Sequence, residues 1–240
     1  MPALCIEGLR KQFGGVKALN GVDLTIEDGE ILGIVGPNGS GKTTLFNVVT
    51  GVHKPTAGTV TWDGTDMTGM PAHAISRAGI GHTFQQAMCF PGLTVVENVL
   101  IATEHHGNRR GGAYPWTTPR ELLGFVGLSH LRDAVAGPLP FGSLRLLGLA
   151  MALAARPALL LLDEPAAGLN DKETAALAGL VSQLPNHGIS ICVIDHDMTL
   201  MRALCRRLVV LDFGTKIADG PTAAVLGDPK VLEVYLGGEL

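Results

Sequence analysis

The segment that most constrains the fold is the octapeptide GPNGSGKT at residues 36–43. It follows a continuous apolar stretch, ILGIV at residues 31–35, and it precedes a predicted helix that ends at Gly51. The octapeptide matches the pattern GxxxxGK[S/T], in which glycines let successive backbone N–H groups turn toward one anion. The N-terminus of the following helix adds partial positive charge. A buried strand, a glycine-rich loop and a helix in this order predict an α/β fold with a phosphate-binding loop.

The residues of this loop have separate expected tasks. Lys42 is long enough to reach the β- and γ-phosphates of a nucleotide, and the Thr43 hydroxyl is suited to bind Mg²⁺. We therefore expect the chain to bind ATP together with Mg²⁺. The predicted nucleotide-binding positions are Gly36, Pro37, Asn38, Gly39, Ser40, Gly41, Lys42, Thr43 and Thr44.

Two adjacent acids end a second apolar stretch, LLLLDEP at residues 159–165. Ligands of open α/β sheets bind at the carboxyl ends of the strands, which is where Asp163 and Glu164 are expected. Asp163 would hold Mg²⁺ through water, and Glu164 would act as the general base toward the attacking water. A strand that ends in solvated acids is the plain alternative, but the phosphate loop in the same chain favours the catalytic interpretation.

Helices and apolar strands alternate through much of the chain, which predicts a parallel sheet covered on both faces. The first 30 residues instead carry short alternating stretches typical of antiparallel strands. We predict one domain, with its core at 1–86 and 151–240 and a mostly helical insertion at 87–150. The predicted helices are 94–106, 119–128, 144–156, 171–184 and 198–207, and the predicted strands of the second half are 158–163, 190–195 and 207–212.

Composition argues against several other classes of protein. The net charge of −4 provides no general attraction to nucleic acid. The N-terminus lacks the apolar region of a signal peptide, and the longest apolar stretch is interrupted by Arg145, Arg156 and Pro157. We therefore expect a chain without a membrane span that is either cytosolic or held by partners at the cytoplasmic face of the cell membrane. The cysteines lack CxxC spacing and are expected to be buried and reduced; they are Cys5, Cys89, Cys192 and Cys205.

Taken in order, these motifs resemble the nucleotide-binding subunit of an ABC transporter over nearly the whole chain. The resemblance implies a RecA-like P-loop NTPase core, an N-terminal antiparallel β subdomain and a helical subdomain insertion. It also implies that Gln85 senses Mg²⁺ and the attacking water, that His196 contacts the γ-phosphate, and that Phe13 stacks on adenine. The segment AAGLN at 166–170 matches a loop that crosses the dimer interface. For Phe13, a hydrophobic contact under the first hairpin is nearly as well supported.

Several stretches resemble one branch of this family, the ATPases of branched-chain, or hydrophobic, amino acid uptake. They include TVVENVL, DEPAAGLN and the C-terminal LVVLDFGTKIADGPTAAVLGDPKVLEVYLG. The resemblance implies ATP hydrolysis coupled to transport, with a second ATPase subunit, two membrane permease subunits and an extracytoplasmic substrate-binding protein as partners. Urea or amide uptake and lipopolysaccharide export remain alternatives. A soluble ABC protein of translation or DNA repair, or a small-molecule kinase, fits the sequence less well.

The chain departs from the family at the signature, which usually reads Leu-Ser-Gly-Gly-Gln. Pro140 has neither a hydroxyl nor an N–H group, so it offers no donor to a γ-phosphate. In ABC dimers each ATP lies between the phosphate loop of one chain and the signature of the other. The departure therefore predicts a weakened site on the partner's phosphate loop, and an intact site on Lys42 and Glu164. The signature positions are Leu139, Pro140, Phe141, Gly142 and Ser143.

The insertion ahead of the signature is shorter than this branch usually has. It contains AYPWTTP at residues 113–119, with two large aromatic side chains. Tyr114 and Trp116 are either anchors for a partner protein or packing residues of the loop, and the sequence leaves both interpretations open.

Overall fold

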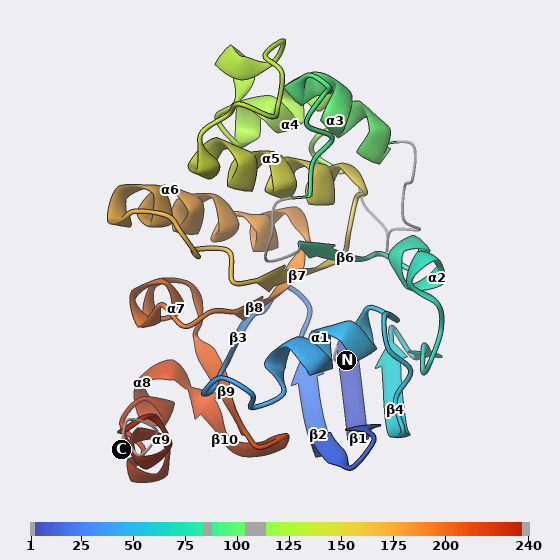
Figure 1. Ribbon diagram of the computed structural model, residues 1–240, viewed down its shortest axis with the longest axis vertical. Helices are drawn as coiled ribbons and strands as arrows, with labels where there is room; N and C mark the ends of the chain where they lie inside the picture. The colour runs from blue at the N-terminus through green and yellow to red at the C-terminus, as the bar shows by residue number, and fades with distance from the viewer. Residues whose placement is uncertain (1–2, 84–87, 104–113, 237–240) are drawn as a thin grey trace.

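A central six-stranded sheet organises the computed structural model, which describes residues 3–83, 88–103 and 114–236 (Figure 1). All neighbouring strands in this sheet are parallel except the last pair at one edge, which is antiparallel. The predicted parallel sheet is thus confirmed. In spatial order its strands are β10 (Thr215–Pro221), β9 (Arg207–Asp212), β3 (Ile31–Val35), β8 (Ser190–Ile194), β7 (Leu159–Asp163) and β6 (Ile80–Thr83).

The two faces of this sheet belong to two hydrophobic clusters. In β7, Leu160 and Leu162 face one cluster, and Leu159 and Leu161 face the other, because side chains alternate along a strand. Every residue of β7 is buried, as expected for a strand covered on both sides. The first cluster contains most of the helices; the second contains α1 (Lys42–Val49) and the antiparallel sheet.

The antiparallel sheet is built from the first part of the chain, as the alternating sequence predicts. It lies beside α1 at the lower right of Figure 1. Phe46 of α1 packs in the same cluster as Ile6 and Trp62 of this sheet and Ile34 of the central sheet. Helix α1 thus joins the two sheets. In spatial order the strands are β2 (Val16–Ile26), β1 (Leu4–Phe13), β4 (Ala57–Trp62) and β5 (Thr65–Asp66).

Most of the remaining helices cover the first cluster, whereas Ile75 of helix α2 belongs to the second. Helix α4 begins with a capping box, in which Thr118 and Glu121 each bind the other's backbone N–H. Helix α6 begins with the same device from Asn170 and Glu173. The helices are α2 (Ala72–Arg77), α3 (Val95–Thr103), α4 (Pro119–Phe125), α5 (Phe141–Ala154), α6 (Asp171–Val181), α7 (Met198–Leu204), α8 (Thr222–Val225) and α9 (Pro229–Leu236), with short 3₁₀ turns at Ser129–Leu131 and Leu184–His187.

Helix α5 begins at Phe141, three residues before the predicted start at Leu144. Pro140 is its N-cap with φ −55° and ψ 150°, a conformation that proline adopts without strain. The helix ends before Arg156, whose φ is +54°, and before Pro157. The helix continues without a break across residue 150. The division between insertion and core at that residue stays a prediction.

The segment with Tyr114 and Trp116 packs inside the protein. Their exposed fractions are only 7% and 8%. The Tyr114 hydroxyl donates to the carbonyl oxygen of Leu153 at 2.6 Å, and the Trp116 ring lies 4.3 Å from the Phe125 ring. The structure therefore favours packing over the partner-anchor interpretation.

Two strands of the central sheet are not predicted by the sequence patterns. Strand β6 is only four residues long and contains Gly81 and His82, which hide its apolar character. Strand β10 lies at the sheet edge, with no fully buried residue. Cys192 and Cys205 are buried as expected, whereas Cys5 and Cys89 are half-buried; all four are free thiols. Within the described ranges, no helix is long and apolar enough to cross a membrane.

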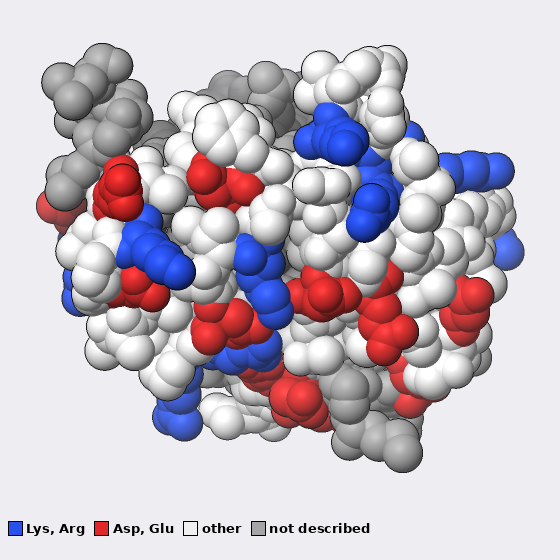
Figure 2. Space-filling model, turned by 90° about the horizontal axis from the view of Figure 1, so that it is seen from below, with Lys and Arg blue, Asp and Glu red and all other residues white. Residues whose placement is uncertain are grey.

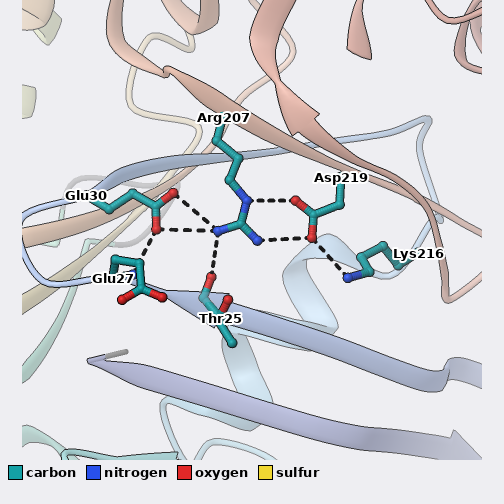
Figure 3. A network of polar contacts seen from close by, with 6 residues as sticks. All are labelled: Thr25, Glu27, Glu30, Arg207, Lys216 and Asp219. Atoms are coloured by element: carbon teal, nitrogen blue, oxygen red, sulfur yellow. Dashed lines mark hydrogen bonds and ion pairs between the residues drawn. The ribbon is translucent and has the colours of Figure 1, made fainter. Parts of the chain in front are cut away.

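A charged network ties the two sheets together at the end where β3 and β9 begin. Figure 2 shows acidic and basic side chains mixed over the face seen from below. In Figure 3, the Arg207 guanidinium lies between Glu30 and Asp219. Its Nε donates to Asp219 at 2.7 Å, and its Nη1 donates to the Thr25 carbonyl oxygen at 3.1 Å and to Glu30 at 3.3 Å. Arg207 Nη2 also donates to Asp219 at 3.0 Å, and Lys216 is a second cation at the same carboxylate, at 3.0 Å.

Removing the central cation of this network should destabilise the fold. Arg207→Ala leaves two partly buried carboxylates without their shared partner, so we expect a loss of about 2 kcal/mol in the free energy of unfolding. Burial raises the pKa of Asp219, but hydrogen bonds from Arg207 and Lys216 bring it below the usual value. The contribution of Asp219 is therefore complete above about pH 4 and is lost as the pH falls further.

Chemical denaturation at neutral and acidic pH measures this effect. Arg132→Ala is the matched control, because Arg132 pairs with Asp133 on the exposed surface and should contribute less than about 0.5 kcal/mol. Equal effects of the two substitutions at neutral pH would contradict a stabilising role for the network.

Candidate nucleotide site

The predicted site residues come together because parallel strands end at one edge of the central sheet. Ile34 and Asp163 both pair with Ile194 in the sheet register. The phosphate loop follows β3, the acids close β7, and His196 follows β8. Three separate segments of the sequence thus meet at one edge, as expected for an open α/β sheet.

The phosphate loop depends on glycine at its two ends. Gly36 has φ +150°, and a Cβ there would collide with the Leu211 carbonyl oxygen. Gly41 has φ +105° and is the N-cap of α1, which has no side-chain cap. The first N–H groups of α1 are therefore not used by a capping side chain and can bind an anion.

Lys42 folds back over the loop. Its Nζ donates to the carbonyl oxygens of Gly36 and Pro37 at 2.7 and 2.9 Å. Burial lowers the pKa of Lys42, and the negative charges of Glu164 and Asp163 oppose that shift. The ammonium is therefore held at the mouth of the loop, within the field of both acids. Thr43 is exposed and Thr44 half-buried in the first turn of α1, and Ser40 is buried.

Asp163 is in an environment that disfavours its charge. Burial and the neighbouring Glu164 raise its pKa to about 6, although Lys42 acts in the opposite direction. Its exposed fraction is 7%. A divalent cation would relieve this repulsion, because it would add positive charge beside the carboxylate.

Glu164 has an unusual backbone conformation. Its φ is +46°, a region that costs a residue with a side chain about 1 kcal/mol. Its N–H donates to the Ile194 carbonyl oxygen at 2.7 Å. The strained turn directs the chain away from the end of β7, and its place beside Lys42 and Asp163 supports a functional role.

His196 is accessible, with 73% of its side chain exposed, and its Nδ1 lies 3.8 Å from Asp195 Oδ1. Asp195 itself was not singled out by the sequence patterns, because an acid at the end of a strand is common. Its side chain is fully buried and accepts hydrogen bonds from the N–H groups of Ala166 and Asp197. The complete burial of this charged side chain indicates a role for Asp195, and only the structure shows that burial.

Phe13 lies at the end of β1, with its ring 5.1 Å from the His53 ring. Its exposed fraction is 43%, and Lys11 Nζ lies 4.7 Å from the centre of its ring. The ring is therefore partly accessible, and its role in binding adenine stays a prediction. Gln85 lies outside the described residues, and its role stays a prediction. Tyr235 was missed: burial raises its pKa, and a hydrogen bond with the backbone of Gly36 opposes that shift. The C-terminal helix α9 thus reaches the phosphate loop.

The signature residues surround the start of α5. Phe141 packs on Gly168, where a Cβ would collide with the ring, and Gly142 lies against Glu173. The Arg145 guanidinium lies 5.0 Å from the centre of the Phe141 ring, and its Nη2 donates to the Ala167 carbonyl oxygen at 3.3 Å. The start of α5 is therefore fixed to the loop that follows Glu164. Leu139 is half-buried, while Pro140 is exposed and provides no side-chain cap.

The residues present fit a magnesium ion that a nucleotide brings with it. Among the described residues, no group of three or more His, Cys, Asp or Glu could hold a metal. Mg²⁺ typically binds one or two protein oxygens together with phosphate oxygens and water. Thr43 and Asp163 provide oxygens that suit such a magnesium ion.

The raised pKa of Asp163 makes a testable prediction about stability. The folded protein binds a proton at Asp163 more tightly than the unfolded chain does, so this carboxyl destabilises the fold as the pH rises from about 4 to 6. Asp163→Asn should therefore increase the free energy of unfolding of the nucleotide-free chain by roughly 1–2 kcal/mol at pH 7.5. Below about pH 4 the difference should disappear.

Urea unfolding at several pH values tests this, with Asp171→Asn on the exposed first turn of α6 as the control. That control should change stability by less than about 0.5 kcal/mol. An Asp163→Asn chain less stable than the wild type at pH 7.5 would contradict the prediction.

Comparisons with known proteins agree with this geometry. A family model described as ABC transporter matches residues 19–167, and one described as branched-chain amino acid ATP-binding cassette transporter matches residues 215–240. The high-affinity branched-chain amino acid transport ATP-binding protein BraF of Pseudomonas aeruginosa is 39% identical over 98% of both chains. LivG of Escherichia coli K12, which carries the same description, is 37% identical over 98% of both chains.

Solved structures show the same relationship. The crystal structure of the ADP conformation of an ATP-binding cassette of an ABC transporter has a TM-score of 0.88 at 34% identity and covers 99% of both chains. A nucleotide-free cassette has a TM-score of 0.87 at 32% identity, covering 98% of this chain and 99% of its own. The predicted fold class is confirmed, and the chain belongs to the ATP-binding subunits of ABC transporters, as an ABC-type ATPase of the branched-chain amino acid group.

Proposed function

We propose that this chain hydrolyses ATP to drive an ABC importer of branched-chain or other hydrophobic amino acids. The observation that carries the proposal is the meeting of Lys42, Asp163 and Glu164 at one edge of the sheet, where the charge of Glu164 acts on the pKa values of Lys42 and Asp163. The substrate class is supported by the names of BraF and LivG and by the match of the C-terminal segment.

Each residue has a distinct part in hydrolysis. Phe13 stacks on the adenine, and the backbone N–H groups of residues 36–44 bind the phosphates. Lys42 leaves the carbonyl oxygens of Gly36 and Pro37 and binds the β- and γ-phosphates instead. Glu164 takes a proton from the attacking water as that water's oxygen bonds the γ-phosphorus and the bond to ADP breaks. His196 donates a hydrogen bond to the γ-phosphate.

Magnesium is the cation that this reaction uses. Thr43 and Asp163 would hold it, Asp163 through water, with Gln85 as the third predicted contact. When bound, it neutralises phosphate charge and the charge on Asp163.

Transport requires partners that this chain does not contain. We propose a second ABC ATPase subunit, two membrane permease subunits and an extracytoplasmic substrate-binding protein, with this chain at the cytoplasmic face of the membrane and no nucleic acid partner. A dimeric cassette from another ABC ATPase bound to ADP and phosphate, 27% identical to this chain, supports pairing of two cassettes. The permease and binding-protein subunits would select the amino acid.

The two ATP sites of the proposed dimer would be unequal. The site on Lys42 and Glu164 has its full set of groups and needs an intact signature from the partner. The site on the partner's phosphate loop would face Pro140, which has no donor. A dimer of two copies of this chain would then have two weakened sites.

Hydrolysis by a mixed dimer tests both parts of the proposal. The chain mixed with its partner ATPase should turn over ATP several-fold faster than the chain alone. Glu164→Gln should abolish turnover at its own site while the protein still binds ATP, because the amide cannot accept the proton, and an ATP-bound dimer should accumulate. Phosphate release and size-exclusion chromatography measure the two effects, with Glu173→Gln in the α6 capping box as control.

Two outcomes would contradict the proposal. Equal and fast turnover by the chain alone would exclude unequal sites. Undiminished turnover in Glu164→Gln would exclude Glu164 as the base. Reconstitution of the complete transporter in vesicles, with leucine and urea as competing substrates, tests the substrate class.

Restoring the signature hydroxyl should strengthen the partner's site. The backbone of Pro140, with φ −55° and ψ 150°, suits a serine at a helix N-cap. Pro140→Ser combined with Ser143→Gln should at least double turnover by the mixed dimer. The control is Pro138→Ser, an exposed proline in the same loop. Unchanged turnover in the restored variant would show that Pro140 does not limit that site.

A further inference from the structure

Asp195 is a fully buried carboxylate between the two loops that carry Glu164 and His196. Its residue exposure is 1%. Both carboxylate oxygens are used: Oδ2 accepts from the Ala166 N–H at 3.0 Å, and Oδ1 accepts from the Asp197 N–H at 2.9 Å. Ala166 lies two residues after Glu164, and Asp197 directly follows His196. One side chain therefore holds the backbone of both loops.

The same two loops are joined a second time by backbone atoms. The Glu164 N–H donates to the Ile194 carbonyl oxygen at 2.7 Å. The backbone N–H groups of Glu164 and Ala166 are thus both held, by the consecutive residues Ile194 and Asp195 at the end of β8. These two hydrogen bonds maintain the φ of +46° at Glu164, because a strained residue persists only where its surroundings determine it.

The position of Asp195 requires a side chain with two acceptor oxygens. An asparagine of the same shape has one acceptor oxygen, so its NH₂ group would face one of the two N–H donors. The acids facing this region are Asp163 and Glu164, and the cations are Arg145 and Lys42. His196 lies 3.8 Å away. Arg145 also binds the Ala167 carbonyl oxygen, so the loop after Glu164 is held from both sides.

We propose that Asp195 is a positioning residue for hydrolysis, which fixes Glu164 and His196 relative to each other by holding the backbone of both loops. The inference rests on the proposed roles of Glu164 and His196 at the γ-phosphate. It needs no contact between Asp195 and the nucleotide. Its consequence is that loss of one hydrogen bond should affect the chemical step and leave nucleotide binding nearly intact, since the phosphate loop belongs to β3 and α1.

Asp195→Asn tests this inference in the mixed ATPase complex. We expect kcat to fall at least tenfold, because a small displacement of a catalytic group has effects of this order, while KM and the Kd for ATP change less than twofold. The matched control is Asp197→Asn. The side chain of Asp197 caps α7 through the N–H groups of Thr199 and Leu200, and asparagine caps a helix equally well. Its kcat should stay within twofold of the wild type.

Hydrogen exchange gives a second readout that does not depend on activity. In Asp195→Asn, the amides of Ala166 and Glu164 should exchange at least tenfold faster, and those of α1 should be unchanged. Asp195→Glu, which restores two acceptor oxygens, should recover part of both protection and kcat.

The outcomes separate this inference from the proposed function. If the wild-type complex does not hydrolyse ATP, the proposed function fails. If the wild type is active and Asp195→Asn keeps its kcat, the positioning role is excluded. A parallel loss of kcat and ATP affinity with faster exchange throughout the chain would show a general structural role instead, and would also overturn the inference.

Discussion

The parallel pairing of β3, β8 and β7 is the constraint on which the site depends. Parallel strands place their carboxyl ends at one edge, so a loop, a histidine and two acids from distant parts of the sequence arrive there together. The buried leucines of β7 limit how far this pairing can slip, because a slip that drew Asp163 into the sheet would place its carboxylate between the two hydrophobic clusters. The hydrophobic pattern of the sheet therefore helps to determine the relative positions of the polar groups that we propose act on ATP.

The sequence predicted the parts of the fold that have strong local patterns. Strand β7 is a continuous apolar run, and the phosphate loop is a motif whose glycines are required by its backbone. The short β6 and the edge strand β10 were missed because their residues are only partly apolar. Helix α5 starts three residues before the predicted Leu144 because Pro140 serves as its N-cap. Asp195 and Tyr235 were missed because their roles depend on contacts across the fold.

The charged side chains at the two ends of the central sheet differ in how well they are paired. At the end where β3 and β9 begin, Arg207 satisfies Glu30 and Asp219 with short hydrogen bonds. At the opposite end, Asp163 keeps a raised pKa and Glu164 a strained backbone. Binding groups that are poised for a ligand are destabilising without it, and the well-satisfied network at the other end offsets part of that cost.

The contacts also join the chain's own site to the surface that would face the partner's ATP. Phe141 and Arg145 fix the start of α5 to the loop at Ala167 and Gly168, and Asp195 fixes the same loop to the segment with His196. A packed loop has few alternative arrangements. A shift of α5 when the two cassettes close would therefore change the position of Glu164. Pro140, next to these contacts, provides no donor, but the packing of Phe141 and Arg145 on the loop is present. In the proposed dimer, a subunit with a weak signature would therefore still respond to the binding of its partner through the loop that carries Glu164.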